Sequence, residues 1–288
     1  MHKLAGVRVG NPNQIRIMGI INTSPESFYK KSVFTDKQTI AKTAKLMEEE
    51  GADFIDVGGM STAPYLKTQV SEDQEINRIT NAIETIQKVS KLPVSIDTCR
   101  AKVAKVALQL GAEIINDVSG LKYDKKMIDV LEEYHPSVIV CAFSNELIRG
   151  NQVMQARKLI NQSVSMAIKT GISKNNIVVD PALGFFRKMS HGILFTKINS
   201  DWLERDILVL KNLNKIKDGY PILVSISRKS FIGEMLNERD PEKRLYGSIA
   251  AETFAALNGA DIIRTHNVKA TSDIIKIIKN LENLKKGL

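Results

Sequence analysis

The sequence of 288 residues contains little cysteine and no long apolar run. Its two cysteines, Cys99 and Cys141, are too few for a disulfide scaffold, so we expect buried thiols in an intracellular protein. No stretch approaches the roughly 20 apolar residues that a membrane-spanning helix needs. The first residues do not form the apolar segment of a secretory signal peptide. These absences predict a cytoplasmic protein without membrane contact.

Common metal and nucleophile motifs are also missing. The four histidines and two cysteines form no His-x-His, His-Glu-x-x-His or Cys-x-x-Cys spacing, which argues against a zinc site. No Gly-x-Ser-x-Gly elbow occurs, and His266 has no evident serine partner for a nucleophilic triad. The residues therefore favour a site that binds and polarises a ligand.

Charge is unbalanced toward the positive side. Lysine and arginine exceed aspartate and glutamate by 41 − 32 = 9, which favours an anionic partner. Many lysines, among them Lys42 and Lys45, fit solvated helix faces, so the pattern argues against nucleic acid. The 43% of hydrophobic residues can form a full core.

Short segments rich in Ile and Val recur eight times along the chain, and a helical pattern follows each of them. Continuous apolarity is typical of parallel strands that helices cover on both faces. The expected strands are 15–22, 53–58, 94–97, 113–117, 137–142, 177–180, 222–227 and 261–266. Helical patterns include 39–50, 72–89, 100–110 and 241–257, and Gly51, Gly111 and Gly259 stand where C-caps belong.

Eight strand and helix units predict one (β/α)₈ TIM barrel that spans residues 1–288 as a single domain. The alternative is a doubly wound sheet. Two observations argue against the doubly wound sheet. No Gly-x-Gly-x-x-Gly sequence follows the first expected strand, and polar strand ends occur in all eight units rather than at one switch point.

The carboxyl ends of barrel strands open onto one face, where active sites form. The polar residues at these ends are Asn22, Asp56, Asp97, Asn116, Asp117, Cys141, Asp180, Ser227, Lys229, Arg264 and His266. Taken alone, Asp56 and Asp117 are better explained as loop or helix caps. Together the set offers hydrogen bonds to a heterocycle and charge-assisted bonds to an anion.

Several of these residues stand in longer motifs. The motifs are Asn22-Thr23-Ser24-Pro25-Glu26-Ser27-Phe28, Asp56-Val57-Gly58-Gly59-Met60-Ser61-Thr62, Ser95-Ile96-Asp97, Asn116-Asp117, Asp180-Pro181, Ser227-Arg228-Lys229-Ser230 and Arg264-Thr265-His266. From about residue 16 to 268, their order resembles the signature of dihydropteroate synthases. Corrinoid methyltransferases that use methyltetrahydrofolate share the aspartate and asparagine strand ends but are not expected to carry the Ser-Arg-Lys-Ser segment.

The resemblance implies a transferase of folate biosynthesis. It would join 6-hydroxymethyl-7,8-dihydropterin pyrophosphate to 4-aminobenzoate or a related arylamine and release pyrophosphate. The resemblance also implies Mg²⁺ as cofactor and a homodimer formed through the last helices.

The resemblance further implies a role for each matching residue. Lys229, Arg264 and Asn22 would be catalytic. Asp97, Asn116, Asp180, Lys229 and Arg264 would bind the pterin. Asn22, Arg264 and His266 would hold the pyrophosphate, with Asn22 also approaching Mg²⁺. Phe28, Thr62, Pro64 and Ser230 would line the arylamine side.

Departures from the family pattern cluster on the arylamine side. In the first loop, Tyr29-Lys30-Lys31-Ser32 stands where the family has a polar, acidic and glycine-rich stretch, and in the second loop Met60 and Ala63 stand where it has an acid and an arginine. The fifth strand ends in Cys141-Ala142 instead of Met-His, and Ala182 and Phe186 stand at positions of glycines. The sixth loop is also longer, through residues 189–203. Lys30 and Lys31 would suit a phosphorylated arylamine, as in synthesis of a methanopterin-type coenzyme. A corrinoid-dependent methyltransferase and a non-catalytic pterin-binding paralogue also stay open.

Overall fold

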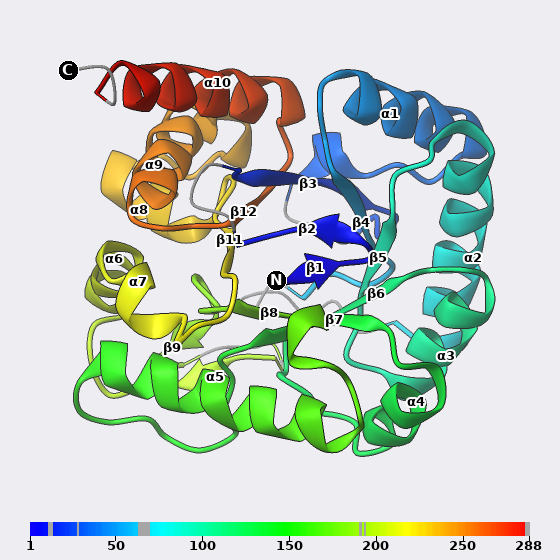
Figure 1. Ribbon diagram of the computed structural model, residues 1–288, viewed down its shortest axis with the longest axis horizontal. Helices are drawn as coiled ribbons and strands as arrows, with labels where there is room; N and C mark the ends of the chain where they lie inside the picture. The colour runs from blue at the N-terminus through cyan, green and yellow to red at the C-terminus, as the bar shows by residue number, and fades with distance from the viewer. Residues whose placement is uncertain (11–13, 28, 63–69, 190–191, 193, 286–288) are drawn as a thin grey trace.

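The computed structural model describes residues 1–10, 14–27, 29–62, 70–189, 192 and 194–285. Eight parallel strands surround its centre in the order β11-β12-β3-β4-β5-β6-β7-β8 (Figure 1). They are β3 (Arg16–Asn22), β4 (Phe54–Gly58), β5 (Val94–Asp97), β6 (Ile114–Asp117), β7 (Ser137–Cys141), β8 (Ile177–Asp180), β11 (Leu223–Ser225) and β12 (Ile262–Thr265). A parallel bridge between Val179 and Ile222 joins the two end strands. The predicted (β/α)₈ barrel is therefore confirmed, and the doubly wound alternative is wrong.

Helices surround the strands. They are α1 (Lys37–Glu49), α2 (Glu72–Val89), α3 (Ala101–Gln109), α4 (Met127–Tyr134), α5 (Gln152–Lys169), α6 (Trp202–Lys211), α7 (Leu213–Ile216), α8 (Ser230–Leu236), α9 (Leu245–Leu257) and α10 (Val268–Lys285). Short 3₁₀ turns form η1 (Lys30–Ser32), η2 (Lys174–Asn176) and η3 (Pro241–Arg244), so the helix expected at 241–257 begins as a 3₁₀ turn. Among the described residues, no helix is long and apolar enough to span a bilayer.

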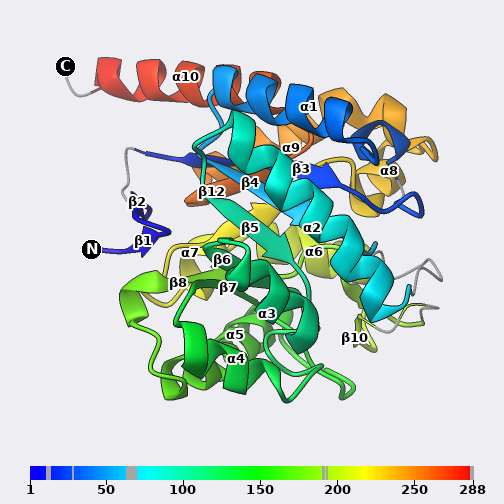
Figure 2. The same cartoon turned by 90° about the vertical axis from the view of Figure 1, so that its right-hand side faces the viewer.

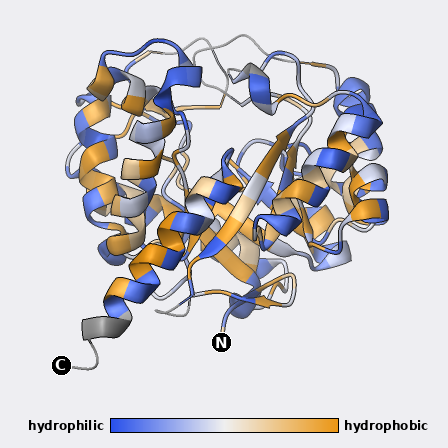
Figure 3. Ribbon diagram, turned by 90° about the horizontal axis from the view of Figure 1, so that it is seen from above, coloured by the Kyte–Doolittle hydropathy of each residue, from blue (hydrophilic) through white to orange (hydrophobic). Residues whose placement is uncertain are grey.

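Local sequence signals explain where several helices begin and end. Ser71 and Gln74 form a reciprocal capping box at the start of α2, which satisfies two otherwise unpaired backbone donors. Gly51, Gly111 and Gly259 have φ angles of +97°, +92° and +98°, which glycine adopts without a Cβ penalty. The predicted C-cap glycines are confirmed. Hydrophilic residues colour much of the outer helix surface, while hydrophobic residues face the sheet (Figure 3).

Four short strands were not predicted. β1 (Lys3–Leu4) and β2 (Val7–Arg8) form an antiparallel hairpin whose Leu4 packs with apolar side chains inside the barrel. β9 (Phe186–Arg187) and β10 (Thr196–Lys197) pair in parallel within the long loop after β8. Figure 2 shows the hairpin and β10 on opposite sides of the barrel, so the hairpin closes the end away from the polar strand ends.

The barrel interior is layered because side chains alternate along each strand. The apolar layer contains Met18, Phe54, Ile114, Ile139, Val178, Leu223 and Ile262. Two residues further along the same strands stand Ile20, Asp56, Asn116, Cys141, Asp180, Ser225 and Arg264. This second layer is mostly polar, and it forms the floor on which the site is built.

Candidate active site

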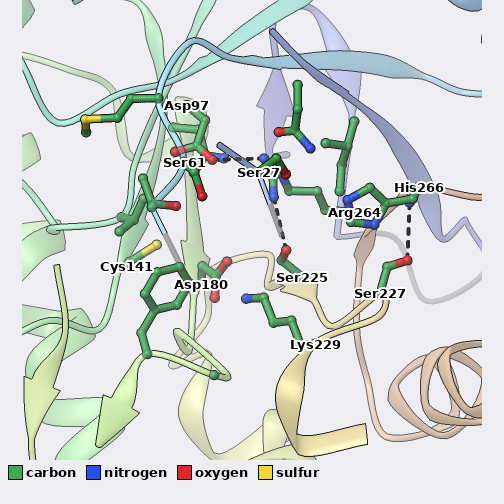
Figure 4. Close-up of a pocket in the computed structure, with 18 of the residues that line it drawn as sticks. Ser27, Ser61, Asp97, Cys141, Asp180, Ser225, Ser227, Lys229, Arg264 and His266 are labelled. Carbon is green, nitrogen blue, oxygen red and sulfur yellow. Dashed lines mark hydrogen bonds and ion pairs between the residues drawn. The ribbon is translucent and has the colours of Figure 1, made fainter. Parts of the chain in front are cut away.

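A pocket of about 820 Å³, including its open mouth, lies at the carboxyl end of the barrel (Figure 4). Its walls come from all eight strands or the loops that follow them. The polar and charged lining residues are Asn22, Ser27, Ser61, Thr62, Asp97, Asn116, Asp180, Ser225, Ser227, Lys229, Ser230, Arg264 and His266. The structure thus brings together nine of the eleven polar strand-end residues that the sequence predicted to converge, and Asp56 and Asp117 are not among the lining residues.

Arg264 is held at the pocket floor by acidic groups from two other strands. Its Nε donates to Asp56 Oδ2 at 2.6 Å, and its Nη2 donates to Asp97 Oδ2 at 2.9 Å. Asp56 Oδ2 also accepts a bond from Asn116 Nδ2 at 3.2 Å. Such charge-assisted bonds fix the plane of the guanidinium group. Asp56 therefore orients two residues of the pocket wall.

Asp97 presents an unsatisfied acceptor to the pocket. Within the described part of the chain, its Oδ1 is buried and has no hydrogen-bond partner. Burial raises the pKa of Asp97 to about 7, although the nearby Arg264 charge opposes the change. A buried carboxylate oxygen without a donor is costly, so this position suits a ligand that brings an N–H group.

Asp180 and Lys229 form the opposite wall (Figure 4). Asp180 Oδ1 accepts a bond from the Ala182 backbone N–H at 2.6 Å, and burial raises the pKa of Asp180. Lys229 Nζ donates to the Leu183 carbonyl at 2.7 Å and lies 4.5 Å from the centre of the Phe185 ring. Burial lowers the pKa of Lys229 to about 8, with Asp180 opposing that change. A carboxylate and an ammonium group therefore line the same wall of the pocket.

Asn22 and His266 lie on the side of the pocket near the first loop. Asn22 Nδ2 donates to Ser32 Oγ at 2.7 Å, which leaves its carbonyl oxygen as an acceptor. Burial, followed by the Arg264 charge, lowers the pKa of His266 well below its usual value, so its ring is neutral at pH 7. The Tyr29 ring packs edge-on against His266 at 5.0 Å and under the Arg228 guanidinium at 4.3 Å.

The pocket rim carries hydroxyl groups from several loops. Thr62 and Ser230, both predicted on the arylamine side, line the pocket. Ser230 Oγ accepts a bond from Arg187 Nη2 at 2.6 Å. Phe28 and Pro64, predicted beside them, lie outside the described residues, as does Ala63.

Lys31 has a different environment from the one expected. Its Nζ forms an ion pair with Glu242 of η3 at 2.8 Å, and both side chains are exposed. Lys31 is not among the residues that line the pocket. Lys31 is thus held by an acid of η3 outside the lining of this pocket, and the expectation that it faces the arylamine stays a prediction.

Asp56 and Asp117, which the sequence predicted to be caps, have different partners in the structure. Asp117 accepts bonds from the Ser119 and Leu121 backbone N–H groups, so the cap interpretation is correct for this residue. Asp56 instead points inward to Arg264, so for Asp56 that interpretation is wrong. The missed signal is spacing: Asp56 lies two residues after the inward Phe54 and must face the same side.

The donor set bears on metal binding. Among the described residues, no group of three or more histidine, cysteine or acidic side chains could hold a metal ion. Mg²⁺ usually keeps several waters and binds one or two protein oxygens together with substrate phosphates. The Asn22 carbonyl oxygen fits that pattern, whereas a cage made only of protein ligands does not.

Comparisons with known proteins agree with this geometry. Residues 18–266 match the family model described as pterin binding enzyme. A dihydropteroate synthase of Synechocystis sp. is 34% identical over 269 residues, which cover 91% of this chain and 88% of the relative.

Solved structures give the same result. A dihydropteroate synthase of Coxiella burnetii in complex with pteroic acid is 34% identical, covers 94% of both chains and has a TM-score of 0.80. The synthase of Xanthomonas albilineans with 4-aminobenzoic acid is 29% identical, also covers 94% of both chains and has a TM-score of 0.81. The chain is thus an enzyme of the transferase class and belongs to the dihydropteroate synthase family of pterin-binding barrels.

Proposed function

We propose that this pocket joins 6-hydroxymethyl-7,8-dihydropterin pyrophosphate to 4-aminobenzoate and releases pyrophosphate, as in folate biosynthesis. The observation that carries the proposal is the buried Asp97 Oδ1, which faces the pocket without a donor among the described residues. A pterin edge carries several N–H groups in one plane. It can satisfy this oxygen without moving the Arg264 bond to Oδ2.

The pterin would lie deep in the pocket, on the polar layer of the barrel. Asp97, Asn116 and Asp180 would accept or exchange hydrogen bonds with its ring edge. Lys229 would donate to a ring carbonyl or nitrogen, and the Arg264 guanidinium would stack on the ring. Asp97, Asn116, Asp180 and Arg264 come from strand ends, and Lys229 stands directly before α8, so the rigid barrel sets their geometry.

The pyrophosphate would lie beside Arg264, Asn22 and His266. The bond from the pterin methylene carbon to the leaving oxygen breaks while the amine nitrogen forms a bond to that carbon, and the nitrogen then loses one proton to solvent. Negative charge develops on the leaving pyrophosphate, so the Arg264 cation stabilises the transition state more than the ground state. The neutral His266 ring can donate a hydrogen bond to a phosphate oxygen. Bound Mg²⁺, held at the Asn22 oxygen and the phosphates, would neutralise part of the leaving-group charge.

The amine requires positioning rather than a strong base, because an aniline-type nitrogen is already unprotonated at neutral pH. Thr62 and Ser230 at the rim would hold the far end of the acceptor. Lys31 lies in an ion pair with Glu242, which removes one of the two charges that favoured a phosphorylated acceptor. Plain 4-aminobenzoate is therefore the preferred assignment.

The proposal is tested by measuring pyrophosphate release from the pterin pyrophosphate with a panel of arylamines. We expect release with 4-aminobenzoate that depends on Mg²⁺ and is abolished in Lys229→Ala. Faster release with a ribosyl-phosphate arylamine would favour the methanopterin-type synthase. Pterin binding without release would indicate a non-catalytic paralogue. Methyl transfer that survives both Lys229→Ala and Mg²⁺ removal would indicate a corrinoid-dependent enzyme.

We also propose that the chain is a homodimer through α9 and α10. Tyr246, Phe254 and Leu257 share one side of α9 and are 83%, 40% and 61% exposed, and Ile277 and Leu281 are exposed on α10. A second copy of the chain would cover these apolar side chains. Sedimentation velocity should give a dimer for the unmodified chain and a monomer for Tyr246→Glu. A cytoplasmic location is proposed as well, in keeping with the buried free thiols of Cys99 and Cys141.

A further inference from the structure

Arg187 lies directly behind the pocket rim, in the loop that is longer than the family pattern. The β9–β10 pair fixes its backbone, because the Arg187 carbonyl accepts a bond from Ile198 N–H at 3.0 Å. Its guanidinium group stacks on the Trp202 ring at 4.0 Å, and the residue is buried. The β9–β10 pairing and the Trp202 ring therefore hold one cation at a fixed position.

The guanidinium contacts the pocket through Ser230. Arg187 Nη2 donates to Ser230 Oγ at 2.6 Å, while Nη1 donates to the Phe186 carbonyl at 2.7 Å. Since the Ser230 oxygen already accepts a charged donor, its own hydrogen must point elsewhere. Within the described residues, the Ser230 hydroxyl donates to no protein acceptor, and Ser230 lines the pocket.

The place of the first substrate gives a bound acceptor one orientation. The pterin and its pyrophosphate would fill the pocket beside Asp97, Asp180 and Arg264, so the amine must point there and the other end of the acceptor toward the rim. Ser230 is the first residue of α8 and follows Lys229 in the sequence. Because it also accepts the bond from Arg187, it lies on the positively charged side of the pocket. A molecule with an amine at one end and an anion at the other would place the anion at Ser230.

We propose that Arg187 is a specificity-determining positioning residue, which polarises the Ser230 hydroxyl so that it donates to the anionic group of the arylamine acceptor. Hydrogen bonds that involve a charged group are about twice as strong as neutral ones, so the Arg187 bond makes Ser230 a better donor. The inference rests on the proposed function, because it names how the same site selects its second substrate.

The experiment compares two acceptors of similar shape, anionic 4-aminobenzoate and neutral 4-aminobenzamide. Pyrophosphate release is measured for the unmodified enzyme, Arg187→Met, Arg187→Lys and Ser230→Ala. Arg187→Met should lower kcat/KM for 4-aminobenzoate at least tenfold, mainly through KM, and change the value for 4-aminobenzamide less than twofold. Arg187→Lys, which retains the charge, should lose less. The exposed neighbour Lys188 supplies the matched control, because Lys188→Met removes a charge of the same sign next to Arg187 in the chain.

A double variant separates action through Ser230 from a general charge effect. Once Ser230→Ala is present, Arg187→Met should have little further effect on the preference for the anion. Equal losses for both acceptors, or full additivity of the two substitutions, would overturn the inference. Failure of the unmodified enzyme to release pyrophosphate with either acceptor would instead reject the proposed function. Activity with 4-aminobenzamide shows that each variant is folded.

Discussion

Arg264 Nε lies 2.6 Å from Asp56 Oδ2, so the last strand of the barrel is joined to the second one at the floor of the pocket. The two residues are 208 positions apart in the chain. Asp56 is fully buried and also holds Asn116, whereas Arg264 extends from this contact to Asp97 and Ser225. A carboxylate that does not line the pocket thus sets the positions of two side chains that do.

Asp56→Asn should therefore impair the enzyme although Asp56 is placed behind the ligand. The amide keeps the shape but removes the negative charge that orients Arg264, and a bond to a charged group contributes about 1.5–3 kcal/mol. We expect kcat/KM for the pterin pyrophosphate to fall about tenfold to a hundredfold in steady-state assays. Asp273→Asn on the exposed face of α10 serves as control, and an Asp56→Asn enzyme with normal kinetics would contradict the assigned role.

The pH dependence of the free enzyme should reflect Asp97 and Lys229. Asp97 has a pKa raised to about 7, so its carboxylate forms as pH rises through 7, and pterin binding should strengthen. Lys229 has a pKa lowered to about 8, so its ammonium is lost above pH 8, and binding should weaken. A profile of kcat/KM against pH should show both limbs. Asp97→Asn should remove the acid limb while it leaves the limb near 8.

Asp97 also makes stability depend on pH. Its pKa is higher in the folded chain than the ordinary 3.8, so the folded state binds more protons than the unfolded state between that value and about 7. Stability contributed by this group is present at the acid end of the window and is lost as pH rises through it. The melting temperature of the unmodified chain, relative to Asp97→Asn, should fall from pH 5 to pH 7. A rise over the same interval would contradict the assigned pKa.

Lys31→Ala tests whether the first loop recognises an anionic acceptor. Because Lys31 forms an exposed ion pair with Glu242 and lies outside the pocket lining, kcat/KM for 4-aminobenzoate should change less than twofold. Glu242→Gln breaks the same pair from the other side and should behave alike. A large loss in Lys31→Ala alone would instead support the interpretation that this lysine binds substrate.

The barrel and the set of strand ends could be predicted because their signals are local. Apolar runs, helix periodicity and the glycines at 51, 111 and 259 each depend on a few neighbouring residues. The carboxyl ends of parallel strands then converge for a geometric reason that needs no contact information. The predicted Asp97, Asn116, Asp180, Lys229 and Arg264 line the pocket for this reason.

Features that depend on distant partners could not be predicted in this way. Lys31 pairs with Glu242, and no local pattern distinguishes that contact from a lysine that faces substrate. β9 and β10 have two residues each, too few for any periodicity, yet their pairing places Arg187 behind Ser230. The cap interpretation of Asp56 failed because the same residue type serves a cap or an ion pair, and only the side of the strand decides between them.

Ala182 stands where the family pattern has glycine, and its backbone shows why glycine is preferred. Its φ is +54°, in the left-handed region where a Cβ costs roughly 1–2 kcal/mol. Ala182→Gly removes this strain but gives the unfolded chain more freedom, which offsets about 0.4–1 kcal/mol. The central values of these ranges predict a gain of about 0.8 kcal/mol and, for a chain of this length, a melting temperature higher by roughly 1 °C. Ala41→Gly, inside α1, should instead lower the melting temperature, because glycine disfavours a helix. Equal shifts in both variants would show that the conformation of Ala182 carries no strain.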